Sequence, residues 1–153
     1  ASSLTRLMDM EVPGYKLNAS LRGLLAQRLL RKVCPECSTE RPINEQESQY
    51  TGIAMGSLIR VATSLKAEEK EQRKKEDTLC MRCSGSGYQG RIATYELMTI
   101  SKDIRDAIKQ QKSTHEIEGI AIENGMITLK SYAINLIKQQ LTTISELKKI
   151  CNT

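Results

Sequence analysis

The 153-residue sequence contains no phenylalanine and no tryptophan, and only five tyrosines. Its apolar core must therefore be built from leucine, isoleucine, valine, methionine and alanine. No stretch approaches the run of about 18 uncharged apolar residues that a membrane-spanning helix needs, and no basic start followed by an apolar run indicates a signal peptide. These absences predict a cytoplasmic protein with no membrane span of its own.

The sequence also has few of the groups that catalysis uses. Its single histidine, His115, falls in the first turn of a predicted helix, where we expect a surface side chain, and no nucleophile and base pattern accompanies it. No glycine is followed by lysine, so a phosphate-binding P-loop is absent. We therefore predict no catalytic and no nucleotide-binding residue in this chain.

The length is that of one compact domain or two small lobes. Because the chain begins at Ala1, without methionine and inside a predicted helix, we expect it to be a piece of a longer protein. Its net charge of +5 is a weak indication of nucleic-acid binding. Four thiolates around one divalent ion would lower that charge to about +3, so we expect no nucleic-acid partner.

Four of the five cysteines form two C-x-x-C knuckles, Cys34 with Cys37 and Cys80 with Cys83, separated by 42 residues. A two-residue spacing lets one tight turn aim both thiolates at the same ion, and two such turns complete the tetrahedral four-sulfur shell of a structural zinc site. The separation exceeds the roughly 15–20 residues of a compact zinc ribbon. We predict that these four cysteines bind one zinc ion. The ion would join the two ends of the segment between the knuckles, residues 38–79, which is called the excursion below; its neck is the point where these two ends meet.

Other interpretations of the knuckles remain open. A reducing compartment disfavours disulfides, and a thioredoxin-type redox pair would need only one knuckle on a βαβ unit, but iron fits the same four-sulfur geometry. Glycines at positions 85, 87 and 90 permit the backbone conformations that turn amide N–H groups toward the sulfurs. The fifth cysteine, Cys151, is predicted to be a small buried hydrophobic residue or an idle thiol.

Apolar spacing predicts the elements before and around the knuckles. In chain order they are a helix end over 3–10 stopped by Pro13-Gly14, a helix that carries Leu21, Leu24 and Leu25 and ends near Gln27, an extended arm over 28–33, and a short helix or strand within 53–61. Residues 66–77 are almost entirely charged, with five charges of each sign, and predict a solvated helix.

After the second knuckle, residues 91–98 alternate as a strand, with Ala93, Tyr95 and Leu97 on one side and Ile92 on the other. We expect this strand to pair with the arm over 28–33. Four short amphipathic helices follow. Ser101 caps the first, and the second begins with a capping box at Ser113 and ends at Gly125. The third carries Leu129, and the fourth begins with a second capping box, from Thr143 to Glu146.

These residues together resemble a known family, the type II secretion ATPases and the closely similar type IV pilus assembly ATPases. The segments that carry the resemblance are LRGLLAQRLLRKVCPEC at 21–37, C-x-x-C-x-G-x-G-Y-x-G-R-I-A-x-Y-E-L at 80–97, Gly125-Met126 with Leu129, and LTRLMDM at 4–10. The resemblance covers nearly the whole chain and corresponds to the C-terminal portion of such ATPases.

The resemblance implies an α+β fold: the C-terminal end of a RecA-like α/β ATPase core, with a tetracysteine zinc-binding insertion and a C-terminal bundle of short helices. It divides the chain into residues 1–33, the tail of the ATPase core; residues 34–90, the metal-binding subdomain; and residues 91–153, a core strand followed by a helical C-terminal subdomain. The Walker A and Walker B motifs of the family are missing from the sequence. We therefore expect this fragment not to hydrolyse ATP by itself.

The resemblance further implies a homohexameric parent that binds ATP and Mg²⁺ and powers type II secretion or type IV pilus assembly. Its partners would be the cytoplasmic domain of a bitopic inner-membrane protein and an inner-membrane platform protein, placing it in the cytoplasm at the periphery of that membrane. This fragment would have a structural, force-relaying role. Two other classes also contain such cysteines: a free-standing zinc ribbon that binds nucleic acid, and a chaperone-type zinc finger.

Overall fold

The computed structural model describes residues 4, 6–7, 10 and 12–151. It combines helices with two small sheets, and the chain forms two compact units. Unit 1 comprises Ala1–Gln27 and Tyr95–Leu129, and unit 2 comprises Arg28–Thr94 and Lys130–Thr153. Among the described helices, none has both the length and the apolar character that crossing a bilayer requires.

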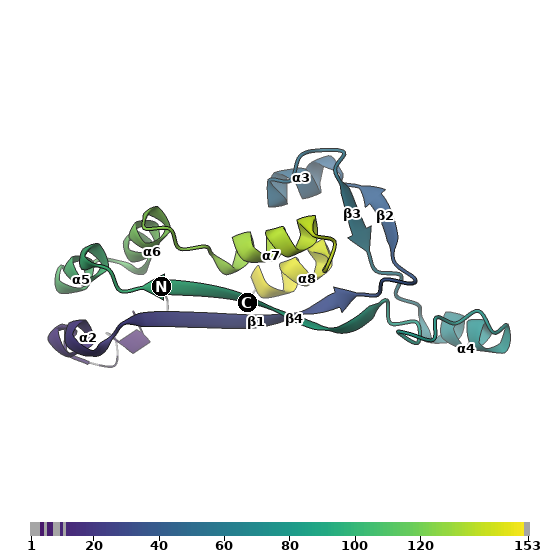
Figure 1. The fold of residues 1–153 in the computed structure, drawn as a ribbon, viewed down its shortest axis with the longest axis horizontal. Helices are drawn as coiled ribbons and strands as arrows, with labels where there is room; N and C mark the ends of the chain where they lie inside the picture. Colours follow the sequence, from purple (N-terminus) through teal and green to yellow (C-terminus); the bar gives the residue numbers. More distant parts are fainter. Residues whose placement is uncertain (1–3, 5, 8–9, 11, 152–153) are drawn as a thin grey trace. The chain divides into compact units, whose positions relative to one another are not determined.

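Strands β1 (Gly23–Val33) and β4 (Tyr88–Thr99) are neighbours in a two-stranded sheet (Figure 1). At one end the Ile100 N–H donates to the Arg22 carbonyl (3.0 Å), and at the other the Cys34 N–H donates to the Gly87 carbonyl (2.9 Å). The strands therefore run in opposite directions, so the end of β1 meets the start of β4. This confirms the predicted pairing of the two arms that carry the knuckles.

The helix predicted over residues 21–27 is wrong. Helix α2 (Gly14–Ser20) lies earlier and begins directly after Pro13, so the Pro13-Gly14 pair starts a helix here. The chain is already extended at Leu21, and β1 then alternates, with Leu24 half-buried and Leu25 exposed. Leucines spaced this way fit either period, and pairing with β4 decides for the strand. The helix predicted over 3–10 lies partly outside the described residues; Leu4, Arg6 and Leu7 are helical.

Strand β4 shows the expected alternation, and at both ends it is longer than the strand predicted over residues 91–98. The face that carries Ile92, Thr94 and Met98 is the buried one, whereas Tyr95 and Leu97 are exposed. Met98 packs into the core of unit 1, and Ile92 packs against that of unit 2. Core packing in each unit therefore determines which side of the strand is covered.

Unit 1 contains α2, α5 (Lys102–Lys109) and α6 (Thr114–Glu123). Both predicted caps are formed: the Ser101 hydroxyl accepts from the Ile104 N–H, and Ser113 forms a complete capping box with Glu116. His115 is exposed in the first turn of α6, as predicted. The fully buried side chains of this core include Leu4, Met98, Ile104, Ile108 and Ile117.

The described part of unit 2 contains the knuckles, a second sheet and helices. Strands β2 (Thr39–Pro42) and β3 (Leu58–Val61) pair antiparallel, with Thr39 opposite Val61 and Pro42 opposite Leu58. Helices α7 (Leu129–Lys138) and α8 (Ile144–Cys151) cover the core, of which Leu30, Ile59, Ala133, Ile137 and Leu147 are fully buried members. Leu129, the first residue of α7, is assigned to unit 1.

Two elements of the excursion differ in how well they could be predicted. Helix α4 (Ala67–Lys75) is the solvated helix expected from its charges, and it buries no residue. Helix α3 (Glu45–Thr51) was not predicted, although Asn44 and Glu47 form a complete capping box at its start. That Asn-x-x-Glu spacing was the available sequence signal.

Candidate metal centre

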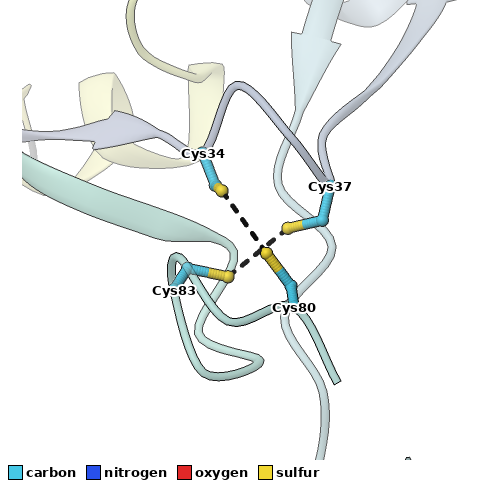
Figure 2. Close-up of side chains that lie close together, drawn as sticks. All are labelled: Cys34, Cys37, Cys80 and Cys83. Carbon is cyan, nitrogen blue, oxygen red and sulfur yellow. Dashed lines mark hydrogen bonds between the residues drawn. The ribbon is translucent and has the colours of Figure 1, made fainter. Parts of the chain in front are cut away.

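The four knuckle cysteines lie together in unit 2, with their sulfur atoms within 4.8 Å of one another. Figure 2 shows the side chains pointing toward a common centre, with Cys34 and Cys37 from the loop after β1 and Cys80 and Cys83 from the turns before β4. The Cys34 and Cys80 sulfurs are 3.9 Å apart, and those of Cys37 and Cys83 are 3.4 Å apart. The structure thus brings together all four residues predicted from spacing; metal ligation stays a prediction.

These distances fit a four-sulfur metal site. A tetrahedral zinc ion with bonds of about 2.3 Å places its sulfur ligands about 3.8 Å from one another. The two measured separations lie on either side of this value. Cys34 and Cys83 are buried and the other two are half-buried, as in a closed structural site with no position left for substrate. The cluster can hold a metal ion such as zinc.

Tight turns hold each knuckle in place. The Ser38 N–H donates to the Cys34 carbonyl (3.2 Å), and the Ser84 N–H donates to the Cys80 carbonyl (2.8 Å). The backbone amides of Gly85 and Gly87 donate toward the Cys83 sulfur. Both glycines have positive φ, 73° and 75°, so the predicted role of glycine in turning amides toward sulfur is confirmed for these two. Gly90, the third glycine of the prediction, lies within β4.

The thiol pKa values show how one sulfur is prepared for ionisation. Burial opposes charge on Cys83, but hydrogen bonds from Cys37 and from the Gly87 and Gly85 amides lower its pKa to about 7. Burial, together with the nearby sulfurs of Cys83 and Cys34, raises the pKa of Cys37. Like charges this close cannot all ionise by themselves, so a bound cation is what would compensate four thiolates.

An ion pair that the sequence pattern did not reveal joins the two knuckles. Glu36 lies between the first two cysteines and Arg82 between the second two, and Arg82 Nη1 lies 3.0 Å from Glu36 Oε1. Arg82 Nε also donates to Gln89 Oε1 (2.6 Å). Both charged side chains are about half exposed, so the pair contributes at most about 1 kcal/mol. The pair links the two knuckles through their central residues.

We expect Gly87→Ala to destabilise the chain by about 2 kcal/mol or more. A Cβ there would lie 2.9 Å from the carbonyl carbon of Thr63 and 3.1 Å from Ala62 Cβ, and alanine would also have to adopt a positive φ. Gly90→Ala is the matched control: it has nearly the same φ, and among the described residues no heavy atom lies within 4 Å of its Cβ. Denaturant unfolding of both variants measures the difference; equal losses would contradict the close approach.

A second polar cluster, also missed from sequence, lies where β1 approaches α8. Thr143 Oγ1 accepts from the Glu146 N–H (3.4 Å), the expected cap. The Glu146 carboxylate, however, does not complete the predicted capping box. It accepts from the Arg31 N–H (3.0 Å) and guanidinium (2.8 and 3.0 Å), and from Lys149 (2.7 Å). Burial opposes ionisation, but these donors lower the pKa of Glu146 to about 2.

Cys151 lies outside both clusters. Its side chain is exposed on the last turn of α8, so the first of its two predicted roles, a small buried hydrophobic residue, is wrong. Leu147, four positions earlier, is fully buried, whereas Cys151 is exposed at the end of the helix.

The sequence matches the family described as "Type II/IV secretion system protein" over residues 1–149. It is 35% identical over 146 residues to the type IV pilus assembly ATPase PilB of Thermus thermophilus, covering 95% of this chain and 15% of that protein. It is 32% identical over 148 residues to the type II secretion system protein E of Pectobacterium carotovorum, covering 97% and 26%. The chain thus spans about a quarter or less of these relatives. It belongs to the type II/IV secretion system protein family.

Proposed function

We propose that this chain is the C-terminal, zinc-containing segment of an ATPase that powers type II secretion or type IV pilus assembly. Cys34, Cys37, Cys80 and Cys83 are its zinc ligands, and residues 34–90 form the metal-binding subdomain. The observation that carries the proposal is the convergence of four sulfurs from two knuckles that have 42 residues between them. Four protein sulfurs leave zinc no open position, so the metal serves structure rather than catalysis.

The remaining residues take their roles from the family. Residues 1–33 form the tail of a RecA-like core, and residues 91–153 form a core strand followed by the helical C-terminal subdomain. ATP and Mg²⁺ bind to other parts of the parent, a homohexamer, and this segment relays force. Support comes from relatives that are named as pilus assembly ATPases.

The same family membership supports the proposed partners and location. The parent works in the cytoplasm at the inner membrane, where it contacts the cytoplasmic domain of a bitopic secretion protein and a platform protein. The metal site suits force transfer because it joins two distant chain segments at the neck of an excursion and so limits their independent motion.

Elemental analysis tests the zinc proposal directly. We expect about one zinc per chain in protein purified without added metal, because two knuckles make one closed site. A Cys151→Ser variant should retain the same zinc content, since Cys151 lies outside the cluster. Protein that contains neither zinc nor iron would contradict a metal centre, and protein that contains iron in place of zinc would reassign the metal.

A further inference from the structure

The backbone at the end of β1 is bonded directly to the turn between α7 and α8. The Val33 N–H donates to the Leu141 carbonyl (3.0 Å), and the Thr142 hydroxyl donates to the Arg31 carbonyl (2.8 Å). Thr142 is fully buried. Val33 immediately precedes Cys34, the first metal ligand, so the ligand-bearing strand and this turn are held in one arrangement.

Side chains strengthen the same connection. Arg31 binds the carboxylate of Glu146, and its guanidinium carbon lies 3.8 Å above the centre of the Tyr88 ring. The Tyr88 hydroxyl is 3.1 Å from Thr143 Oγ1, at the start of α8. Glu146 is only 5% exposed at its side chain, so its charge depends on these donors. Arg31, Tyr88, Thr143 and Glu146 are called the α8 clamp below.

The α8 clamp lies within a few residues of both knuckles. Arg31 is three residues before Cys34, and Tyr88 is five residues after Cys83. The Cys34 N–H donates to the Gly87 carbonyl, so the two strands are bonded to each other between the clamp and the cysteines. A shift of β1 along β4 would therefore change both the separation of the knuckles and the position of α8.

We propose that metal binding at the cysteines and docking of α8 stabilise each other, with Arg31, Tyr88 and Glu146 as positioning residues. This inference rests on the proposed zinc site. Holding the ends of β1 and β4 in register orients the cysteine sulfurs before the ion binds, and the bound ion in turn holds the strand ends to which α8 is attached. Such coupling is reciprocal, because binding free energies are linked.

The first test measures zinc affinity by competition with a chromogenic chelator in wild type, Glu146→Gln and Asp106→Asn. Asp106 pairs with Lys109 on α5 in unit 1 (3.3 Å), so Asp106→Asn also removes a paired carboxylate but leaves α8 and the knuckles untouched. We expect Glu146→Gln to weaken zinc binding about tenfold, the lower end of effects outside the ligand shell. Asp106→Asn should leave it unchanged. Equal weakening in both variants, or none in Glu146→Gln, would overturn the coupling.

A milder variant and a second readout cover the case in which Glu146→Gln does not fold. Tyr88→Phe keeps the ring under Arg31 and removes only the hydroxyl that contacts Thr143, and should weaken zinc binding about threefold. Hydrogen exchange should show that chelating zinc from wild type speeds exchange in α8 but not in α5. If removing zinc does not change exchange in α8, the inferred coupling is refuted but the proposed zinc site is not. If wild-type protein contains no metal, both the coupling and the zinc site are refuted.

Discussion

Replacing Cys80 with serine is expected to abolish stoichiometric metal binding and to loosen residues 38–79 far more than α5 and α6. A serine hydroxyl does not ionise near neutral pH and cannot replace a thiolate in the four-sulfur shell. Metal bound at the cysteines closes a loop of 42 residues, and structural zinc contributes on the order of 10 kcal/mol to the folding of small metal domains. Without it, the excursion keeps its own small sheet and helices and the packing of Ile43, Ile53 and Ile59 in the core of unit 2.

Hydrogen exchange resolved along the chain measures this effect, with α5 and α6 as the internal reference. These helices belong to unit 1, whose core contains none of the four cysteines. Cys151→Ser makes the same chemical change at an exposed thiol outside the cluster and should alter neither metal content nor exchange. Equal acceleration across residues 38–79 and the reference helices would refute the view that the metal closes the neck of the excursion.

The second large effect is expected in acid. Because the pKa of Glu146 is about 2 in the folded chain and 4.5 for the unperturbed group, its stabilisation is complete above about pH 5 and is lost as the pH falls toward 2. The groups that face it are Arg31 on β1 and Lys149 on α8, with Tyr88 of β4 behind Arg31. The loss amounts to at most about 3 kcal/mol, and to less in salt, because Arg31 is 44% exposed.

Denaturant unfolding of wild type and Glu146→Gln between pH 7 and pH 2 isolates this contribution. Acid would also protonate the cysteines and release any metal bound to either protein, so the informative quantity is the difference in unfolding free energy between them. We expect that difference to be largest at neutral pH and to approach zero at pH 2. A difference that does not change with pH would show that the Glu146 charge is not what stabilises α8.

Features set by neighbouring residues could be predicted from sequence. The spacing within each knuckle led to four cysteines that do lie together, and the glycines after Cys83 do turn their amides toward its sulfur. Ser101 and Ser113 cap helices as expected. The pairing within each knuckle, the glycine turns and the caps depend on residues two to four positions apart, where backbone geometry alone brings the groups into contact. That the two knuckles meet depends on the pairing of β1 with β4.

The sequence by itself therefore determined the donor set, the helix caps and the alternation of β4. Only the tertiary structure decided that residues 23–27 form a strand, which face of β4 is buried, and that Glu146 binds Arg31, 115 positions away. These outcomes depend on which distant segments pack together. The spacing of the β1 leucines is compatible with both a helix and a strand, and the Glu146 carboxylate could also have capped its own helix. In both cases the free energy of long-range contacts selects the observed structure, and a local sequence pattern carries no information about those contacts.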